Sequence, residues 1–260
     1  SKLHYDWHWQ FITGNGDLGN QGIHQMDIAR WALGATTLSP KVFSVGARAG
    51  YQDNGDTPNS QFVYHQYEKA SLIFEVRGLP KAKEFQDARW NKSMPEFRGA
   101  QVGVIIHCEN GYMVIPSYES AKAFDKNGRE IKSWKQGADH YANFVAAVRS
   151  RRSSDLNAEI LEGHLSSALC HTGNISYLLG KKLAPEAIRE RLQGSPDAAE
   201  TFSRLSEHLI VNGINLENQP LVLGETLRMD VKTERFIRND RANQMLTREY
   251  RKGFEVPSRV

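Results

Sequence analysis

The pattern of apolar and polar residues divides the chain into a sheet-forming middle and a helical second half. Residues 20–34 carry apolar side chains at the helical period and stop at Gly34, which predicts a helix. From residue 41 to residue 125 the period changes to two, and β-branched and aromatic residues become frequent. This pattern predicts strands over 41–48, 61–67, 70–77, 102–107, 111–115 and 122–124. The short connections, one of them containing Asn110-Gly111, indicate hairpins and a largely antiparallel sheet.

In the second half of the chain, the pattern of apolar residues predicts helices followed by an extended arm. Amphipathic segments cover residues 140–149 and 158–179, and Pro185 and Pro196 each begin a further helix, the second ending near residue 212. Residues 214–260 have weak periodicity and predict an extended arm with one short helix near 241–248. The order of elements predicts an α+β fold, with an open, largely antiparallel β-sheet, helices packed on one face, and a C-terminal helical and extended arm.

We therefore expect two regions. Residues 1–194 form the main α+β domain, and residues 195–260 form the C-terminal helix and arm. The free face of the open sheet is expected to bind another subunit, which predicts a homo-oligomer. The main domain divides into an aromatic and glycine segment at 1–19, a helix at 20–34, the sheet at 41–125 and helices at 138–193.

Composition and charge narrow the classes of partner. Of 260 residues, 40% are hydrophobic and 24% charged, which is typical of a globular chain. The net charge of +3 comes from 33 basic and 30 acidic residues that are mixed along the sequence, so no nucleic acid partner is expected. No apolar run has the length of a membrane span. The two cysteines, Cys108 and Cys170, indicate neither a disulfide framework nor a zinc site, and we expect no metal.

The candidate chemistry begins in the predicted helix at 20–34. Asn20, His24, Asp27 and Trp31 follow one another at helical spacing and are expected to share one face. An imidazole there can exchange a proton near neutral pH, so His24 is the candidate proton acceptor. Asn20 could instead cap the helix, and Asp27 could form a surface ion pair with Arg30.

A glycine pattern before this helix resembles a nucleotide-binding fingerprint. Gly14, Gly16 and Gly19 spell G-x-G-x-x-G, but the preceding residues are aromatic and polar rather than a buried strand. We therefore expect no dinucleotide site within this chain.

Aromatic and histidine side chains supply further candidates for substrate binding. Trp7, His8 and Trp9 could offer flat faces to a sugar ring, or they could anchor an N-terminal arm. His164 and His171 share a helix face with Asn174, where they could line a pocket or join a buried polar network. A metal site formed by the N-terminal histidines is poorly supported, because the residues around them look extended rather than helical.

Several motifs carry a resemblance to a known family. They are the aromatic run at 4–9, the segment 14–31, and the stretches 74–80, 162–171 and 246–251. Together they resemble the C-terminal domain of the glucose-fructose oxidoreductase, inositol dehydrogenase and MocA-like oxidoreductases, in their bacterial, planctomycete-rich branch. The resemblance covers nearly the whole chain.

The resemblance implies the substrate-side half of an NAD(P)-dependent oxidoreductase that acts on a sugar or polyol hydroxyl. NAD or NADP would be bound mainly by an N-terminal Rossmann domain that this sequence lacks, so the chain alone is expected to be inactive. His24 and Asp27 match the family's signature, whereas Asn20 stands where the family has an Asp. Asp17, one turn earlier, is the candidate to compensate, and it joins Trp7, His8, His164 and His171 as an expected substrate-binding residue.

Two other functions are consistent with the same residues. One is a noncatalytic carbohydrate-binding or oligomerisation module. The other is an NAD-dependent glycosidase or lyase that uses transient oxidation, as the resemblance also allows. The compartment, bacterial cytoplasm or periplasm, is left open by the sequence.

Overall fold

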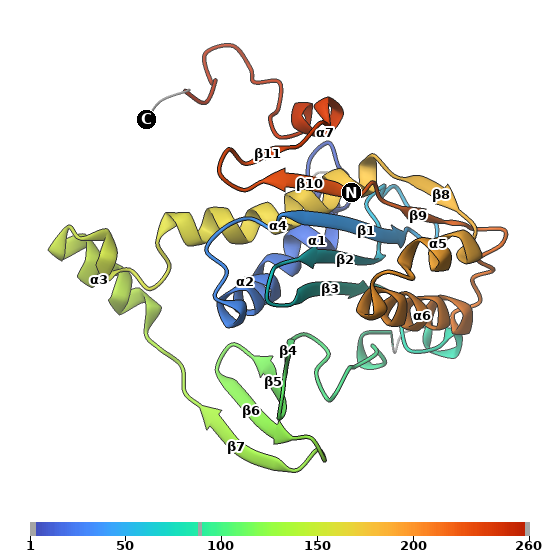
Figure 1. Ribbon diagram of the computed structural model, residues 1–260, viewed down its shortest axis with the longest axis horizontal. Helices are drawn as coiled ribbons and strands as arrows, with labels where there is room; N and C mark the ends of the chain where they lie inside the picture. Colours follow the sequence, from blue (N-terminus) through green and yellow to red (C-terminus); the bar gives the residue numbers. More distant parts are fainter. Residues whose placement is uncertain (1–3, 88–89, 258–260) are drawn as a thin grey trace.

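The computed structural model describes residues 4–87 and 90–257, which form two antiparallel sheets with helices around the larger one (Figure 1). The larger sheet has seven strands, with the order β11-β10-β1-β2-β3 and with β9 pairing β1 and β8. Its strands are β1 (Lys41–Ala47), β2 (Ser60–Gln66), β3 (Ser71–Arg77), β8 (Lys181–Leu183), β9 (Leu221–Leu223), β10 (Leu227–Asp230) and β11 (Arg235–Phe236). The smaller sheet has the order β4-β5-β6-β7, formed by Val104–Cys108, Gly111–Ser117, Ser120–Asp125 and Glu130–Lys135.

Most helices end close to the predicted boundaries, but α1 was not predicted and α7 ends at Gln244, before the predicted residue 248. The α-helices are α1 (Gly16–Asn20), α2 (Gly22–Leu33), α3 (His140–Ser150), α4 (Ile160–Leu178), α5 (Pro185–Leu192), α6 (Pro196–Val211) and α7 (Asp240–Gln244). Short 3-10 turns are η1 (Asp6–Trp9), η2 (Lys83–Phe85), η3 (Trp90–Lys92) and η4 (Ser153–Asp155). No helix among these described residues is long and apolar enough to cross a bilayer.

The α+β class and the open antiparallel sheets are confirmed, but the helices cover both faces of the larger sheet. On strand β2, Val63 packs in one hydrophobic cluster with residues of α1, α2 and α4. Its neighbours Phe62 and Tyr64 point the other way, into a second cluster with α5 and α6. The prediction of helices on one face only is therefore wrong for the larger sheet. Periodicity shows that α6 has an apolar side, but it does not show which face of the sheet that side covers.

The C-terminal region contributes to the larger sheet. Residues 221–236, described above as part of an extended arm, form β9, β10 and β11. Strands β9 and β10 both pair with β1, so this segment completes the sheet at its β1 edge. The division of the chain after residue 194 stays a prediction.

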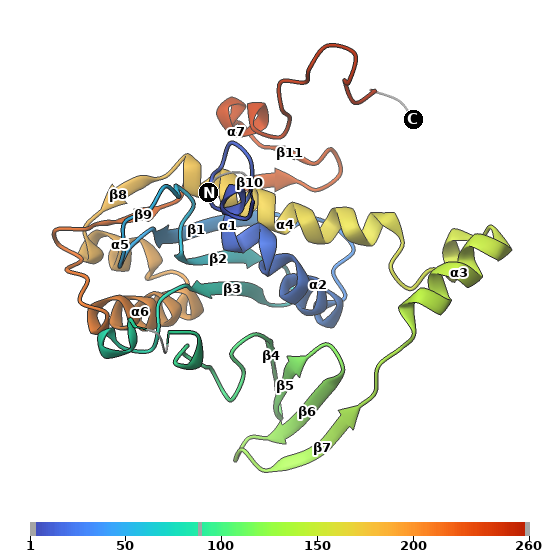
Figure 2. The same cartoon turned by 180° about the vertical axis from the view of Figure 1, so that it is seen from behind.

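The smaller sheet meets the main body where β4 contacts α2, whereas α3 lies apart. In Figures 1 and 2, β4–β7 lie beyond β3 and α2, and α3 extends away from both sheets. Strand β7 is exposed along its whole length, and none of the residues that the structure describes forms a layer over it. Helix α3 exposes four apolar side chains, namely Tyr141, Phe144, Val145 and Val148.

Candidate functional site

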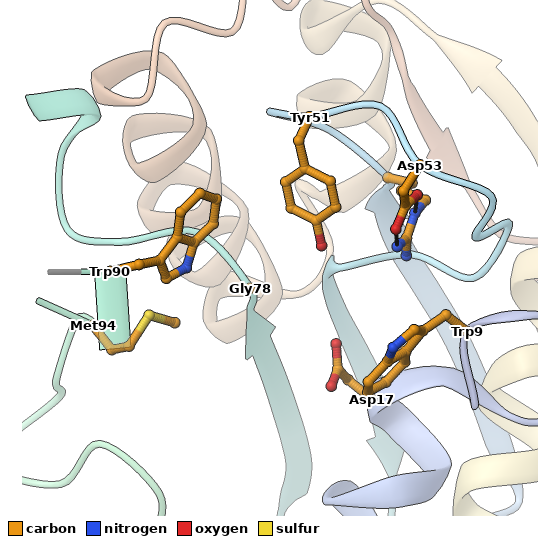
Figure 3. Close-up of a pocket in the computed structure, with 8 residues that line it drawn as sticks. Trp9, Asp17, Tyr51, Asp53, Gly78, Trp90 and Met94 are labelled. Carbon is orange, nitrogen blue, oxygen red and sulfur yellow. Dashed lines mark hydrogen bonds and ion pairs between the residues drawn. The ribbon is translucent and has the colours of Figure 1, made fainter. Parts of the chain in front are cut away.

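A cavity of about 330 Å³ lies between the N-terminal segment and the loops at one end of the larger sheet. Figure 3 shows the hydroxyl of Tyr51 and the carboxylate of Asp17 facing the same space, with Trp9 on one side and Trp90 on the other. The residues that line it come from η1, α1, the β1–β2 loop, the end of β3 and η3. They are Trp9, Asp17, Arg48, Tyr51, Asp53, Gly78, Trp90 and Met94, which we call the aromatic–acidic cavity.

Backbone hydrogen bonds hold Trp9 at the cavity. The amides of Asp56 and Thr57 donate to the carbonyl oxygen of Trp9 at 2.9 and 3.2 Å. The amide of Phe11 donates to Oδ1 of Asp56 at 2.8 Å, and Gln10 Nε2 donates to the carbonyl of Asn54 at 2.9 Å. The aromatic segment is thus fixed to the β1–β2 loop, which also carries the opposite wall of the cavity.

A tight glycine turn positions Asp17 next to Trp9. Gly16 adopts a positive φ of 65°, and a Cβ there would lie 2.7 Å from Thr57 Cβ. A Cβ on Gly14 would lie 2.6 Å from the carbonyl oxygen of His8. Asn174 of α4 donates to the carbonyl of Asn15 at 3.0 Å and secures the turn from the other side. Small residues are therefore required here for close backbone contacts within the protein.

The same contacts show that these glycines do not fit a dinucleotide. Protein atoms fill the space next to Gly14 and Gly16, where a pyrophosphate would have to approach the backbone. The turn precedes the five-residue helix α1 and follows η1 rather than a strand. All strand pairs among the described residues are antiparallel, so the βαβ unit that holds NAD(P) in a Rossmann fold is not formed by them.

The charged groups of the cavity differ in how well they are paired. Arg48 donates to both carboxylate oxygens of Asp53, with Nε at 2.7 Å from Oδ1, and its Nη1 donates to the carbonyl of Thr57 at 2.8 Å. This hydrogen bonding with Arg48 holds the pKa of Asp53 below its usual value. Asp53 is therefore a structural partner of Arg48, with its charge neutralised.

Asp17 lies in a different environment within the same cavity. Among the described residues, no group donates a hydrogen bond to its carboxylate. Burial raises the pKa of Asp17, and the positive charges of Arg48 and His8 offset only part of the rise. A partly desolvated, unpaired carboxyl group in a cavity is a candidate for binding a ligand hydroxyl or accepting a proton.

The predicted catalytic histidine lies on another surface. His24 is exposed on α2, and its ring centroid lies 5.7 Å from that of Tyr118. A second cavity of about 270 Å³ opens nearby between α2 and the smaller sheet, lined by Gln21, Gln25 and Tyr118 among others. His24 is not among the lining residues of either cavity.

The structure separates Asn20 from the other residues of its predicted stripe. The chain breaks helical hydrogen bonding at Gln21, so Asn20 ends α1 while His24 and Asp27 lie on α2. The N-cap position of α2 is Gln21, and Asn20 is an exposed residue rather than a cap. The helix that carries His24 therefore begins at Gly22 rather than at residue 20.

Asp27 takes part in a polar network between α2 and α4. Arg30 is 2% exposed and donates to Ser166 Oγ at 3.0 Å, to the carbonyl of Ala35 at 2.7 Å, and to Glu162. Ser166 in turn donates to Asp27 Oδ1. The alternative of a pair between Asp27 and Arg30 is confirmed at 3.5 Å, but the pair is not confined to the surface, because the guanidinium is buried between the helices.

Two of the residues expected to bind substrate lie beside the cavity. The ring of Trp7 stacks on that of His8 at 3.8 Å, and Trp7 itself is exposed. His8 Nδ1 lies 2.6 Å from the carbonyl oxygen of Tyr5, and its charge acts on Asp17. Of this group, Asp17 and its neighbour Trp9 line the cavity directly.

The histidines of α4 do not form the shared network that their spacing suggested. His164 pairs with Glu234 at 2.8 Å on an exposed surface. His171 has a lowered pKa, caused by burial and then by the charge of Arg248. Asn174 holds the glycine turn, so it and His164 have separate partners, and no hydrogen bond between described residues joins His171 to either of them. Neither histidine lines either cavity.

Most residues of the cavity wall could not be identified as site residues from the sequence. Tyr51 and Asp53 lie in a loop rich in glycine and polar residues, and Trp90 lies in a short 3-10 turn. The ring of Tyr51 meets that of Trp90 edge-on at 5.8 Å, across nearly forty positions of sequence. Among the described residues, no group of three or more His, Cys, Asp or Glu side chains could hold a metal ion.

Comparisons with known proteins give a limited likeness. No protein-family model matches this sequence, and no curated protein matches it. Among solved structures, a "putative oxidoreductase" from Klebsiella pneumoniae is similar at a TM-score of 0.38 and 11% identity, over 58% of this chain and 45% of that one. A "putative oxidoreductase" from Thermotoga maritima is similar at a TM-score of 0.37 and 14% identity, over 57% of this chain and 40% of that one. The chain spans less than half the length of each, and at these values the likeness supports no inference about activity.

Proposed function

We propose that the aromatic–acidic cavity binds a sugar or polyol, and that the chain is the substrate side of an NAD(P)-dependent oxidoreductase. The observation that carries the proposal is the cavity itself. Three aromatic side chains and the unpaired carboxyl group of Asp17 converge on one space of about 330 Å³.

A polyhydroxylated ring matches this lining. Its C–H faces can pack against the indoles of Trp9 and Trp90, and its hydroxyl groups can donate to Asp17. The volume lies at the lower end of the range for small-molecule sites, about 300–1,000 Å³. A large ligand would not fit, which favours a single ring or a short polyol.

The oxidoreductase part of the proposal rests on the sequence resemblance. Because the glycine turn does not fit a dinucleotide, NAD or NADP would be held mainly by a Rossmann domain outside residues 1–260. Exposed apolar side chains on α3 support a further contact surface, because an exposed apolar patch commonly marks an interaction site. The expected homo-oligomer would use the smaller sheet, since both faces of the larger sheet are covered.

Within this chain, Asp17 would orient the bound hydroxyl and accept its hydrogen bond. His24 lies on the exposed surface formed by α1 and α2 rather than at the cavity, so its proposed role as a proton acceptor, with Asn20 and Asp27 in supporting roles, applies to a substrate bound at that surface. Asp27 supports α2 through Ser166, so its contribution is to position His24. Trp7 and His8 would extend the binding surface beyond Trp9.

A noncatalytic carbohydrate-binding module is the second candidate. The position of His24 outside both cavities favours it. The two functions differ in the complete protein, which should reduce NAD or NADP when a sugar that binds the cavity is added, if the chain is part of an enzyme. Sugar binding without reduction of the dinucleotide would support the binding module.

Calorimetric titration of the chain with glucose and with inositol tests the binding step. We expect binding, and we expect Trp9→Ala and Trp90→Ala each to weaken it by about three- to tenfold through loss of ring packing. Trp134→Ala is the matched control, because Trp134 is a half-exposed tryptophan on β7 of the other sheet. Absence of binding, or binding that neither cavity variant changes, would refute the proposal.

A further inference from the structure

The charges around the aromatic–acidic cavity do not balance. Its charged lining residues are Asp17, Arg48 and Asp53. Arg48 directs its guanidinium donors to Asp53 and to the carbonyl of Thr57, at 2.7 Å for Nε and 2.8 Å for Nη1. The amide of Gly55 adds a third donor to Asp53 at 3.1 Å. The Arg48–Asp53 pair is therefore internally satisfied, and it presents little free charge to a ligand.

Asp17 is the one charged lining residue that takes no part in the Arg48–Asp53 pair. Its carboxylate accepts no hydrogen bond from the described residues, and Figure 3 shows it directed into the space between Trp9 and Tyr51. Burial raises the pKa of Asp17, and the positive charges of Arg48 and His8 offset this only in part. A positive group on the ligand would supply the missing partner.

We propose that the cavity selects a sugar that carries an ammonium group, with the ring packed against Trp9 and Trp90 and the ammonium bound to Asp17. This inference rests on the proposed function, since it names the class of sugar that the same cavity takes. The aromatic rings add to the preference, because a cation is attracted to the face of an indole or phenol ring.

The same geometry disfavours anionic sugars. A carboxylate or phosphate on the ligand would meet the negative charge of Asp17 without gaining Arg48, whose donors are engaged by Asp53 and Thr57. The expected order of affinity is therefore glucosamine, then glucose, then glucuronate. These probes share one ring and differ in charge.

Calorimetric titrations with the three probes test this order. Glucosamine should bind about tenfold more tightly than glucose, which is the gain of a charge-assisted over a neutral hydrogen bond. In Asp17→Asn, which keeps the size and polarity of the side chain, glucosamine should fall to the affinity of glucose. Glucose itself should change by less than about threefold.

A second variant tests the role assigned to Arg48. Asp53→Asn removes the negative partner of the guanidinium, so glucuronate should gain affinity about fivefold or more. Circular dichroism of both variants shows whether the fold is kept. If Asp17→Asn does not fold, the Asp53→Asn result and the salt dependence of the glucosamine preference carry the test, because screening should weaken that preference.

The failures of the two proposals are distinguishable. If glucose and glucosamine bind equally and both need Trp9, the ammonium preference is wrong and the sugar site stands. Cyclohexylamine has the positive charge but no hydroxyl groups. If it binds as tightly as glucosamine, the site recognises an amine rather than a sugar, and the amino-sugar assignment is overturned. If none of the sugars binds, both proposals fall.

Discussion

Two buried histidines make the stability of this protein depend on pH in a range where few other groups titrate. His65 on β2 is fully buried, and His208 on α6 is 5% exposed. Burial lowers the pKa of His65 to about 3 and that of His208 to about 4, from an ordinary value of 6.5. The perturbation we consider is a decrease of pH from 7.5 to 5.

The direction of the stability change follows from the pH at which the folded and the unfolded state each bind protons. The unfolded chain binds a proton at each histidine near pH 6.5, whereas the folded protein does so only near pH 3 to 4. The free energy of unfolding is therefore at its full value above pH 6.5 and decreases as the pH falls toward the folded-state pKa values. At pH 5 each histidine accounts for a loss of about 2 kcal/mol, and the pair for about 4 kcal/mol.

Other groups with shifted pKa values also respond in this range, and His171 acts in the same direction as His65 and His208, because burial lowers its pKa as well. Carboxyl groups with lowered pKa values, such as Asp53 and Asp125, titrate below their ordinary value of 3.8. Asp17 acts in the opposite direction, because its raised pKa favours the folded state as the pH falls. Variants are therefore needed to isolate the histidines from the rest of the curve.

Urea denaturation followed by tryptophan fluorescence, at pH 7.5, 6 and 5, measures the effect. In His65→Leu the loss between pH 7.5 and 5 should shrink by about 2 kcal/mol, and by about 4 kcal/mol when His208→Leu is added. His140→Leu is the control, because His140 is exposed on α3. An unchanged pH dependence in the double variant would refute the assignment of the loss to these two side chains.

Three further substitutions test the packing around the candidate site. Arg30→Met should lower the free energy of unfolding, measured by urea denaturation, by about 2–4 kcal/mol, because Glu162 and Asp27 lose a buried partner. The control Arg189→Met, in an exposed ion pair, should lower it by less than about 0.5 kcal/mol. Equal effects would contradict the network. Gly16→Ala should lower the free energy of unfolding by more than about 2 kcal/mol and abolish sugar binding, because of the positive φ and the contact with Thr57. The control Gly163→Ala on α4, where the Cβ position is open, should raise the free energy of unfolding by about 0.5–1 kcal/mol. A tolerated Gly16→Ala would show that the turn does not constrain Asp17. Asp17→Asn should raise the free energy of unfolding at pH 7 by about 1 kcal/mol, as expected when an unpaired charge kept for function is removed, and a loss of stability would contradict that reading.

The regular elements of the fold could be predicted where the sequence carries a strong local signal. Helices α3 to α6 begin and end within about two residues of their predicted bounds, because proline, glycine and apolar periodicity mark them. Strands β7 to β11 were missed. Strands β8, β9 and β10 have three or four residues and pair with strands distant in sequence, β11 has only two residues, and β7 lies beyond the predicted end of the sheet at residue 125. Local periodicity cannot report such pairing.

The site was predicted in part for the same reason. Asp17 could be singled out because the glycine turn and its helix are local features. Tyr51, Asp53 and Trp90 reach the cavity from separate loops, so their proximity depends on the tertiary fold. The roles proposed for His24, Asn20 and the α4 histidines stay predictions, since their positions outside both cavities test no catalytic step.

The central claim is that the aromatic–acidic cavity is a sugar-binding site. The most direct measurement is a titration with glucose followed by the indole N–H signals of the tryptophans in a two-dimensional NMR spectrum. The account predicts that the Trp9 and Trp90 signals shift with saturation, while those of Trp31 and Trp134 on other surfaces stay in place. Saturating shifts confined to Trp31 or Trp134, or no shift at any indole, would contradict it.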